Sequence, residues 1–271
     1  MYREYYGLTL PPFDLTPNPR FLFHSAKHRE AFNHMLYGIR ERKGFVQLTG
    51  EVGAGKTTLC RALLEQLDSH FSTALILNPV LSAGELVKAI ATEFGLEVKG
   101  RDRLETLAVM NEFLLKQVEH GKESVLMIDE AQDLSDELLE QVRLLSNIET
   151  DDHKLLQIVL LGQPELRDRL NHPRLRQLRQ RITVRYHLGP LTFVETSQYI
   201  QHRLEMAGAK GVPYFTQPAL WRVYDYSHGT PRLINAVCDK ALLAGFVRQT
   251  DRINYRMVGL AVRELEGKIN V

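Results

Sequence analysis

The sequence predicts an α/β fold, in which a parallel sheet flanked by helices is followed by a small all-helical domain. Short apolar runs alternate with helical patterns from Gly44 to about residue 190, which is typical of strand–helix–strand units. Runs that are apolar on both faces indicate strands covered on both sides. After Gly189-Pro190 only helical patterns remain. We therefore expect an N-terminal covering segment, an α/β domain and a helical lid, at residues 1–43, 44–190 and 191–271.

The same patterns place the individual elements. About 25 residues at the start carry too many prolines for a regular helix, and Ser25 is a suitable N-cap for a helix reaching about Arg42. Strands are expected at 44–50, 73–78, 124–130, 155–162 and 181–188. Helices are expected at 56–67, 83–94, 102–120 and 136–148, with a short arginine-rich piece before the last strand. Lid helices are expected at 192–206, 217–226, 231–247 and 255–265.

Composition narrows the class of protein. The 34 basic and 33 acidic side chains give a net charge of +1, which argues against a protein that mainly wraps nucleic acid, although a local basic stripe is compatible with it. Cys60 and Cys238 lack metal-ligand spacing, so we expect two buried thiols in a reducing compartment. No apolar run approaches the roughly 18 residues that span a bilayer. The start lacks the pattern of a signal peptide. We expect a cytoplasmic chain that reaches a membrane only through a partner.

The strongest functional signal is the stretch GEVGAGKT, which matches the P-loop pattern at every fixed position. It follows an apolar run and opens a helix, where backbone N–H groups and the helix N-terminus attract phosphate. Lys56 is expected to contact the β- and γ-phosphates of ATP, and Thr57 to bind Mg²⁺. The residues expected to bind the nucleotide are Gly50, Glu51, Val52, Gly53, Ala54, Gly55, Lys56, Thr57 and Thr58, together with Arg232.

A second signal is the apolar run Val125–Ile128, which ends in Asp129 and Glu130. Parallel strands deliver their carboxyl ends to the edge where open α/β sheets bind ligands. Asp129 is expected to hold magnesium through water, and Glu130 to polarise the water that attacks ATP. This is the Walker B pattern, and its presence downstream of a P-loop predicts hydrolysis as well as binding.

Three further positions have two interpretations each. Gln163 follows another apolar strand, where it either senses the nucleotide state or caps the next helix. Arg174, Arg176, Arg179 and Arg181 form a cluster that is either a solvated helix face or the source of an arginine finger, for which Arg181 is our choice, followed by Arg179 and Arg176. Arg232 follows a proline at an early helix position. It either points back at the phosphates or is a surface charge.

With these motifs in this order, the chain resembles AAA+ ATPases over essentially its whole length. The resemblance implies that Gln163 occupies the sensor-1 position, the arginine cluster the finger region, and Arg232 in GTPR the sensor-2 position. Gln163 departs from the Asn, Thr or Ser usual at sensor 1.

Three stretches resemble the ExeA/GspA ATPases of general secretion more closely, especially the short MshM-type members of MSHA pilus biogenesis. They are YYGLTLPPFDLTPNPRFLFHSAKHREA, GFVQLTGEVGAGKTTLCR and LLGQPELRDRL. The resemblance implies ATP-driven assembly of a type II secretion or type IV pilus apparatus. It also implies an N-terminal segment that wraps adenine, with Phe13, Phe23 or His28 as candidates that are equally suited to packing. Longer members continue into a membrane span and a peptidoglycan-binding part, which we do not carry over to a chain ending at Val271.

The resulting expectation is an ATP hydrolase that uses Mg²⁺, acts as a homo-oligomer and works on a membrane-bound envelope partner. A DNA-associated AAA+ regulator of the transposition type shares the motif order and is the alternative. A nucleotide-gated scaffold with slow hydrolysis is a third interpretation, because the sequence does not report rate.

Overall fold

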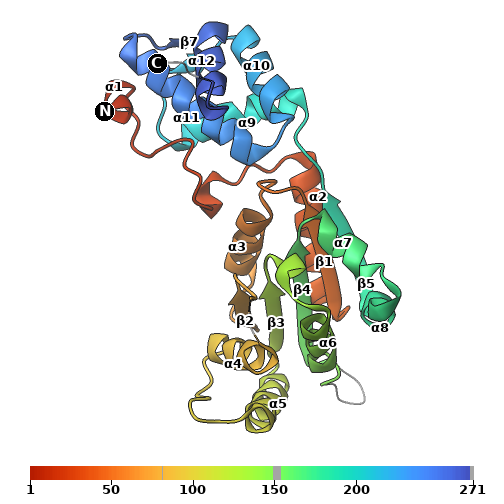
Figure 1. Cartoon of the computed structure of the whole chain (residues 1–271). Helices are drawn as coiled ribbons and strands as arrows, with labels where there is room; N and C mark the ends of the chain where they lie inside the picture. The colour runs from red at the N-terminus through yellow and green to blue at the C-terminus, as the bar shows by residue number, and fades with distance from the viewer. Residues whose placement is uncertain (81, 149–153, 269–271) are drawn as a thin grey trace. The chain divides into compact units, whose positions relative to one another are not determined.

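The computed structural model describes residues 1–80, 82–148 and 154–268. The chain divides into two compact units (Figure 1). We call them the sheet unit, made of Arg29–Gly50 and Leu59–Leu188, and the helical unit, made of Met1–His28, Glu51–Thr58 and Gly189–Val271. The N-terminal segment and the loop after the first strand thus cluster with the C-terminal helices.

The sheet unit is built on parallel strands in the order β2-β3-β4-β1-β5. The strands are β1 (Phe45–Gly50), β2 (Phe71–Ile76), β3 (Glu123–Ile128), β4 (Leu156–Gly162) and β5 (Ile182–Leu188). Adjacent strands pair in parallel, for example Val46 with Val159 and Leu126 with Ile158. The register between β1 and β5 shifts once, between Phe45 and Val46. The predicted parallel α/β fold is confirmed, and its strands lie side by side with helices around them in Figure 1.

The central strands β1 and β4 differ from the edge strand β5 in how much of each strand is buried. Every residue of β1 and β4 is buried, because both strands have two neighbours and helices beside them. β5 instead alternates, with Thr183, Arg185 and His187 exposed. The expectation that every strand is apolar on both faces is therefore wrong for β5. As an edge strand it has a single strand neighbour, so a period of two suffices.

Three helices of the sheet unit begin at side-chain caps. Ser82 with Glu85 and Asp102 with Glu105 form capping boxes at the starts of α4 and α5, and the Ser135 hydroxyl caps α6. The helices are α2 (Ala26–Arg40, whose first three residues belong to the helical unit), α3 (Lys56–Gln66, likewise divided), α4 (Ala83–Glu93), α5 (Arg103–Glu119), α6 (Asp136–Leu145), α7 (Pro164–Leu170) and α8 (Arg176–Arg181). Short 3-10 turns occupy Ala131–Asp133 and Pro173–Leu175.

The helical unit contains α9 (Phe193–Met206), α10 (Gln217–Ser227), α11 (Pro231–Val247) and α12 (Tyr255–Leu265). Two-residue strands, β6 (Tyr214–Phe215) and β7 (Arg252–Ile253), pair in parallel beside them. The start of the chain also belongs here. It has a short helix, α1 (Tyr2–Tyr5), before the first proline and a 3-10 turn at Pro19–Phe21, so the prolines exclude helix only from the stretch they occupy.

Arg203 of α9 ties the N-terminal segment to the helices. Its guanidinium donates to the carbonyls of Pro12 and Asp14 and to the Tyr199 hydroxyl, and it lies over the Phe21 ring at 4.7 Å from the ring centroid. The side chain is buried among carbonyl oxygens and aromatic rings, which satisfy its donors without a carboxylate.

Both cysteines are buried and free, and burial raises the pKa of each thiol well above its usual range. Such thiols are inert packing groups. Across the described parts of the chain, no helix combines the length and the apolar character needed to cross a bilayer.

Candidate nucleotide-binding site

The glycine-rich loop follows β1 and leads into α3, which begins at Lys56. Gly53 and Gly55 adopt left-handed backbone conformations, with φ of 77° and 100°, that residues with a Cβ rarely adopt. The Lys56 side chain is buried, and its Nζ donates to the carbonyl oxygen of Glu51 at 3.1 Å. The loop therefore curls around its own lysine, which is the local conformation that a P-loop requires.

Arg232 contacts this loop within the helical unit. Its backbone N–H donates to the carbonyl oxygen of Gly53 at 3.2 Å. A Cβ added to Gly53 would lie 2.3 Å from the Cβ of Arg232, so glycine is required for this approach. The Arg232 side chain is exposed. Because its Cβ lies against the loop, the side chain is long enough to contact a phosphate bound there.

His28 approaches the loop from the N-terminal segment. Its Nε2 lies 3.2 Å from the carbonyl oxygen of Ala54, and its Nδ1 lies 2.8 Å from the Ser25 hydroxyl. The carbonyl can only accept, so Nε2 carries the proton of the neutral ring and Nδ1 accepts from Ser25. Burial lowers the pKa of His28, opposed in part by its hydrogen bond to Ala54. The backbone N–H of His28 also donates to the Ser25 hydroxyl, which confirms Ser25 as the cap of α2.

The aromatic candidates of the N-terminal segment are packing residues in this structure. Phe13 is 2% exposed and meets Phe215 edge to face within the core of the helical unit. Phe23 packs edge to face against Tyr199. His28 is occupied by Ser25 and Ala54, as described above.

In the sheet unit, Asp129 and Glu130 follow β3 directly. Asp129 is 2% exposed. Its backbone N–H donates to the carbonyl oxygen of Ile76 at 2.8 Å, which extends the strand pairing, and its Oδ1 accepts from the Glu130 N–H at 2.9 Å. A carboxylate at the carboxyl edge of a sheet is a hard oxygen donor of the kind Mg²⁺ prefers, as is the Thr57 hydroxyl in the first turn of α3. Both donors fit magnesium in chemical type.

Glu130 is held by two amide side chains. Its Oε2 accepts from Gln132 Nε2 at 2.8 Å and from Gln163 Nε2 at 3.3 Å. The backbone N–H of Gln163 donates to Gln132 Oε1 at 3.0 Å, which closes a ring of three residues. The structure thus brings Gln163, at the end of β4, onto the carboxylate that the sequence singled out.

Sequence reasoning missed Gln132, a member of this ring, and Arg169, which contacts the ring from outside. Arg169 Nη1 donates to the Gln132 carbonyl oxygen, and Nη2 to Asp136 Oδ1, both at 2.7 Å. Gln132 stands two residues after Glu130 in the stretch DEAQ. Its closeness in sequence to Glu130 is the signal that could have identified it. Arg169 lies on α7 among other charged residues, and no pattern distinguishes it.

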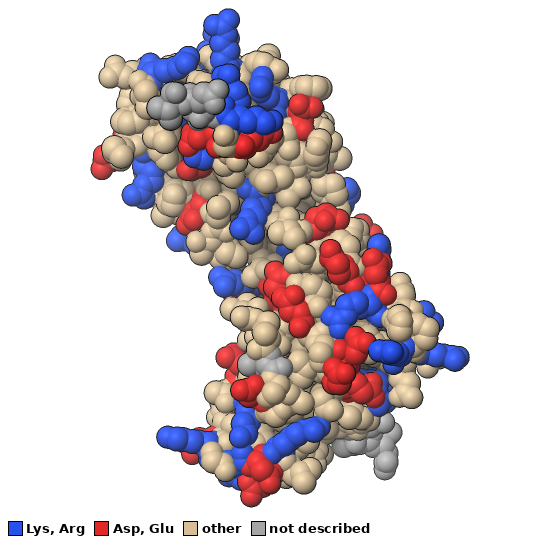
Figure 2. All heavy atoms as spheres, in the orientation of Figure 1, with Lys and Arg blue, Asp and Glu red and all other residues tan. Residues whose placement is uncertain are grey.

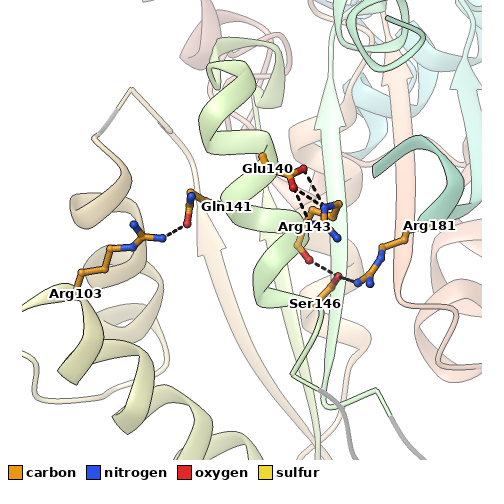
Figure 3. A network of polar contacts seen from close by, with 6 residues as sticks. All are labelled: Arg103, Glu140, Gln141, Arg143, Ser146 and Arg181. Carbon is orange, nitrogen blue, oxygen red and sulfur yellow. Dashed lines mark hydrogen bonds and ion pairs between the residues drawn. The ribbon is translucent and has the colours of Figure 1, made fainter. Parts of the chain in front are cut away.

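The arginine cluster is divided by the fold. Arg174 and Arg176 are exposed, whereas Arg179 and Arg181 are partly buried. Arg181 ends α8 instead of opening β5, and its Nη1 donates to the Ser146 hydroxyl at 2.6 Å. The same hydroxyl donates to the Arg143 carbonyl oxygen at 2.6 Å, at the end of α6 (Figure 3). Within its own unit, Arg181 fastens α8 to α6.

Residues 39–170 match the family model described as AAA domain. Solved structures with a similar fold include the ORC2 protein of Aeropyrum pernix in ADPNP-ADP complexes, with a TM-score of 0.70, 17% identity and coverage of 93% of this chain and 71% of that one. The ORC1 protein of Aeropyrum pernix in complex with DNA has a TM-score of 0.69, 18% identity and coverage of 93% and 68%. Together with the parallel sheet, these matches define the class: the chain has the P-loop NTPase fold of AAA proteins.

Within this class, the chain is similar to General secretion pathway protein A of Aeromonas hydrophila. The two are 47% identical over 268 residues, which are 98% of this chain and 49% of that protein. The chain spans about half the length of this relative. The predicted resemblance to general secretion ATPases is therefore supported for the part that the two proteins share.

Proposed function

We propose that this chain binds ATP with magnesium and hydrolyses it. The observation that carries the proposal is the loop at Gly50–Thr57, whose left-handed glycines and buried lysine present the conformation that receives phosphate at a helix N-terminus. The loop departs from β1, in the sheet whose β3 ends at Ile128, directly before Asp129. Nucleotide complexes of the similarly folded ORC2 protein agree with this assignment.

The residues have distinct roles in the proposed reaction. Backbone N–H groups from Gly53 to Thr58 and the Lys56 ammonium bind the β- and γ-phosphates, and Arg232 contacts the γ-phosphate from the helical unit. Thr57 and Asp129 hold Mg²⁺, which when bound neutralises the charge developing on the phosphate oxygens. Glu130 accepts a hydrogen bond from the attacking water and orients it. The Gln132 and Gln163 amides fix the carboxylate that performs this task.

The test pairs two variants with opposite expected effects. Lys56→Ala removes a charge-assisted phosphate contact and is expected to weaken ATP binding roughly 10- to 100-fold. Glu130→Gln is expected to keep the affinity for ATP while turnover falls roughly 10²- to 10⁴-fold. Glu119→Gln, on the exposed face of α5, is the matched control and leaves both quantities unchanged. Normal turnover in Glu130→Gln contradicts the role of that carboxylate, and unchanged affinity in Lys56→Ala contradicts the site itself.

We further propose that the ATPase works as a homo-oligomer in which Arg181 reaches the nucleotide of a neighbouring copy. Arg181→Ala should then lower turnover by about 10³-fold or more without changing assembly in ATP, measured by sedimentation velocity. Ser146→Ala separates this role from a structural one, because it frees Arg181 from its partner on α6 but leaves the guanidinium in place. If Arg181 is an arginine finger, the Ser146→Ala variant retains its turnover. Equal losses in both variants, accompanied by equal losses of thermal stability, would mean that Arg181 only fastens α8.

We also propose that the chain supports assembly of a type II secretion or MSHA-like type IV pilus apparatus from the cytoplasmic side, through a membrane-bound partner. The likeness to General secretion pathway protein A supports the general secretion part. Glu130→Gln loaded with ATP is the appropriate bait for an envelope extract, with Lys56→Ala as the control that cannot reach the loaded state. Envelope proteins recovered by both baits equally would argue against a nucleotide-dependent partner.

A further inference from the structure

A hollow of about 370 Å³ on the helical unit is lined by arginines from three different elements. Arg222 comes from α10, Arg248 follows α11, and Arg256 and Arg263 come from α12. Tyr255 and Gly259 also line the hollow. Figure 2 shows Lys and Arg side chains gathered at the end of this unit where Figure 1 draws β7, α10 and α12. None of these residues has a role in the nucleotide site proposed above.

Among the described residues, the four guanidinium groups have no ion-pair partner. Within residues 1–80, 82–148 and 154–268, no carboxylate lies at ion-pair distance from any of them. Two nearby acidic side chains are engaged elsewhere, because Glu264 pairs with Lys240 and Glu266 with Lys268. Four like charges around one hollow repel one another. The free energy of this arrangement therefore falls when an anion enters.

The geometry of the hollow is fixed by one glycine and one aromatic ring. The Arg222 guanidinium lies over the Tyr255 ring, 4.3 Å from its centroid. A Cβ at Gly259 would lie 2.9 Å from the Cζ of that guanidinium. The Arg222 guanidinium therefore occupies space that is available only because residue 259 is a glycine. Arg256 and Arg263 stand seven residues apart on α12, which is two helical turns or about 10 Å. A stacked, partly buried arginine thus lies between two exposed ones on one face.

The planar guanidinium of arginine can donate two parallel hydrogen bonds to one phosphate group, which the ammonium of lysine cannot do. Exposed apolar side chains stand next to two of these arginines in the chain. Trp221, beside Arg222, is 56% exposed, and Val247, beside Arg248, is 73% exposed. Neither side chain lines the hollow itself, but an exposed tryptophan on a unit that carries exposed cations is typical of the headgroup level of a membrane. An exposed aliphatic side chain adds nothing to nucleic-acid stacking. A duplex would also require a longer row of cations than a discrete hollow supplies.

We propose that this hollow binds the phosphate headgroups of an anionic phospholipid surface, with Arg222, Arg248, Arg256 and Arg263 as the phosphate contacts and Trp221 and Val247 at the headgroup boundary. Such a contact would hold the helical unit at a membrane without a spanning helix. The proposal is independent of ATP hydrolysis and does not depend on the nucleotide site.

Vesicle binding tests the proposal. The chain is expected to sediment with vesicles of phosphatidylglycerol and phosphatidylcholine but not with phosphatidylcholine alone, and binding should weaken as salt is raised. Arg256→Gln with Arg263→Gln should lower the partition coefficient roughly 20- to 30-fold, at about fivefold for each arginine. The control, Lys99→Gln with Arg101→Gln, removes the same charge from exposed positions of the sheet unit and should change it less than twofold.

A second readout comes from Trp221, the one tryptophan of the sequence. Its emission is expected to shift to the blue and become protected from acrylamide when anionic vesicles are added, in the unaltered chain and in the control but not in Arg256→Gln/Arg263→Gln. Vesicle binding that is equal in the arginine variant and the control overturns the proposal, as does unchanged Trp221 emission on bound vesicles. Tighter binding of duplex DNA than of vesicles at the same salt would also overturn it, in favour of a nucleic-acid surface. Thermal melts of each variant confirm that the helical unit is folded.

Discussion

The P-loop turn and the Walker B turn both follow buried parallel strands, yet they are held by different kinds of contact. In the P-loop turn, two glycines supply the left-handed conformations, and Lys56 is bound by a carbonyl of the loop itself. In the Walker B turn, the left-handed residue is Glu130, with φ of 49° and ψ of 38°, although it carries a side chain. Three side chains from outside the strand, those of Gln132, Gln163 and Arg169, surround that turn.

The conformation of the P-loop turn is therefore determined by its backbone, and that of the Walker B turn by side-chain contacts. A left-handed conformation costs a non-glycine residue about 1–2 kcal/mol, and glycine avoids the cost at Gly53 and Gly55. At Glu130 the cost is offset by hydrogen bonds that also fix the direction of the carboxylate, each contributing about 1 kcal/mol or somewhat more because the acceptor is charged. The P-loop turn should therefore fail when a Cβ is added, and the Walker B turn when an amide is removed.

Among the changes that test this difference between the two turns, the largest effect is expected from Gly53→Ala. The new Cβ would meet the Arg232 Cβ at 2.3 Å, an atom close to the backbone that cannot swing away, and φ of 77° adds strain. We expect ATP affinity to fall by about tenfold or more and the melting temperature to drop. Titration with a fluorescent ATP analogue and a thermal melt measure the two quantities.

Gly84→Ala is the matched control for this prediction. Gly84 lies in α4, has no positive φ, and a Cβ there would meet no atom within 4 Å. Alanine should stabilise the helix by about 0.5–1 kcal/mol and leave ATP affinity unchanged. Equal behaviour of the two variants would show that the P-loop turn is not defined by its backbone.

A smaller effect, confined to catalysis, is expected from Gln132→Ala. The change removes a donor to Glu130 and the acceptor for the Gln163 N–H, so the carboxylate loses its fixed direction. We expect kcat to fall roughly 10-fold with little change in KM, because the phosphate contacts remain.

Arg169→Gln tests whether the support extends one residue further. It removes the contacts to the Gln132 carbonyl and to Asp136 but leaves Gln132 itself. The same split between kcat and KM, at smaller amplitude, is expected. A loss of thermal stability with kcat unchanged would assign Arg169 to the packing of α7 alone.

The same contrast explains what could be predicted from the sequence. The P-loop is a contiguous pattern whose glycines and lysine act within eight residues, so its position and local conformation follow from the motif. The alternation of apolar runs with helical patterns predicts the parallel fold. It does not predict the strand order β2-β3-β4-β1-β5, which depends on contacts between distant segments. Gln132 and Arg169 act through contacts with side chains and carbonyls that the fold brings near, and the burial of Phe13 in the helical unit depends on segments about 200 residues away. Such contacts leave no local pattern, and Arg203 is missed for the same reason.

The smallest effect concerns His28, which meets the P-loop turn from outside and titrates. Burial lowers its pKa in the folded chain below the ordinary value of about 6.5, so the unfolded chain takes up the proton first as the pH falls. The stability contributed by the neutral ring is present above that value and is lost as the pH drops through the folded pKa. His28→Gln should cost about 1 kcal/mol at pH 7.5, or roughly 2–4 °C in melting temperature.

That difference should shrink at pH 5.5, because only the unaltered chain carries the penalty of a buried imidazolium. Ser25→Ala provides the control, since it removes the hydroxyl at Nδ1 but leaves a titrating ring, so its deficit relative to the unaltered chain should depend less on pH. A His28→Gln deficit that stays constant from pH 7.5 to 5.5 would mean that His28 stabilises the P-loop turn by shape alone. In that case the conformation of the P-loop turn depends on its own backbone and on the packing of His28 against it, and not on the protonation state of His28.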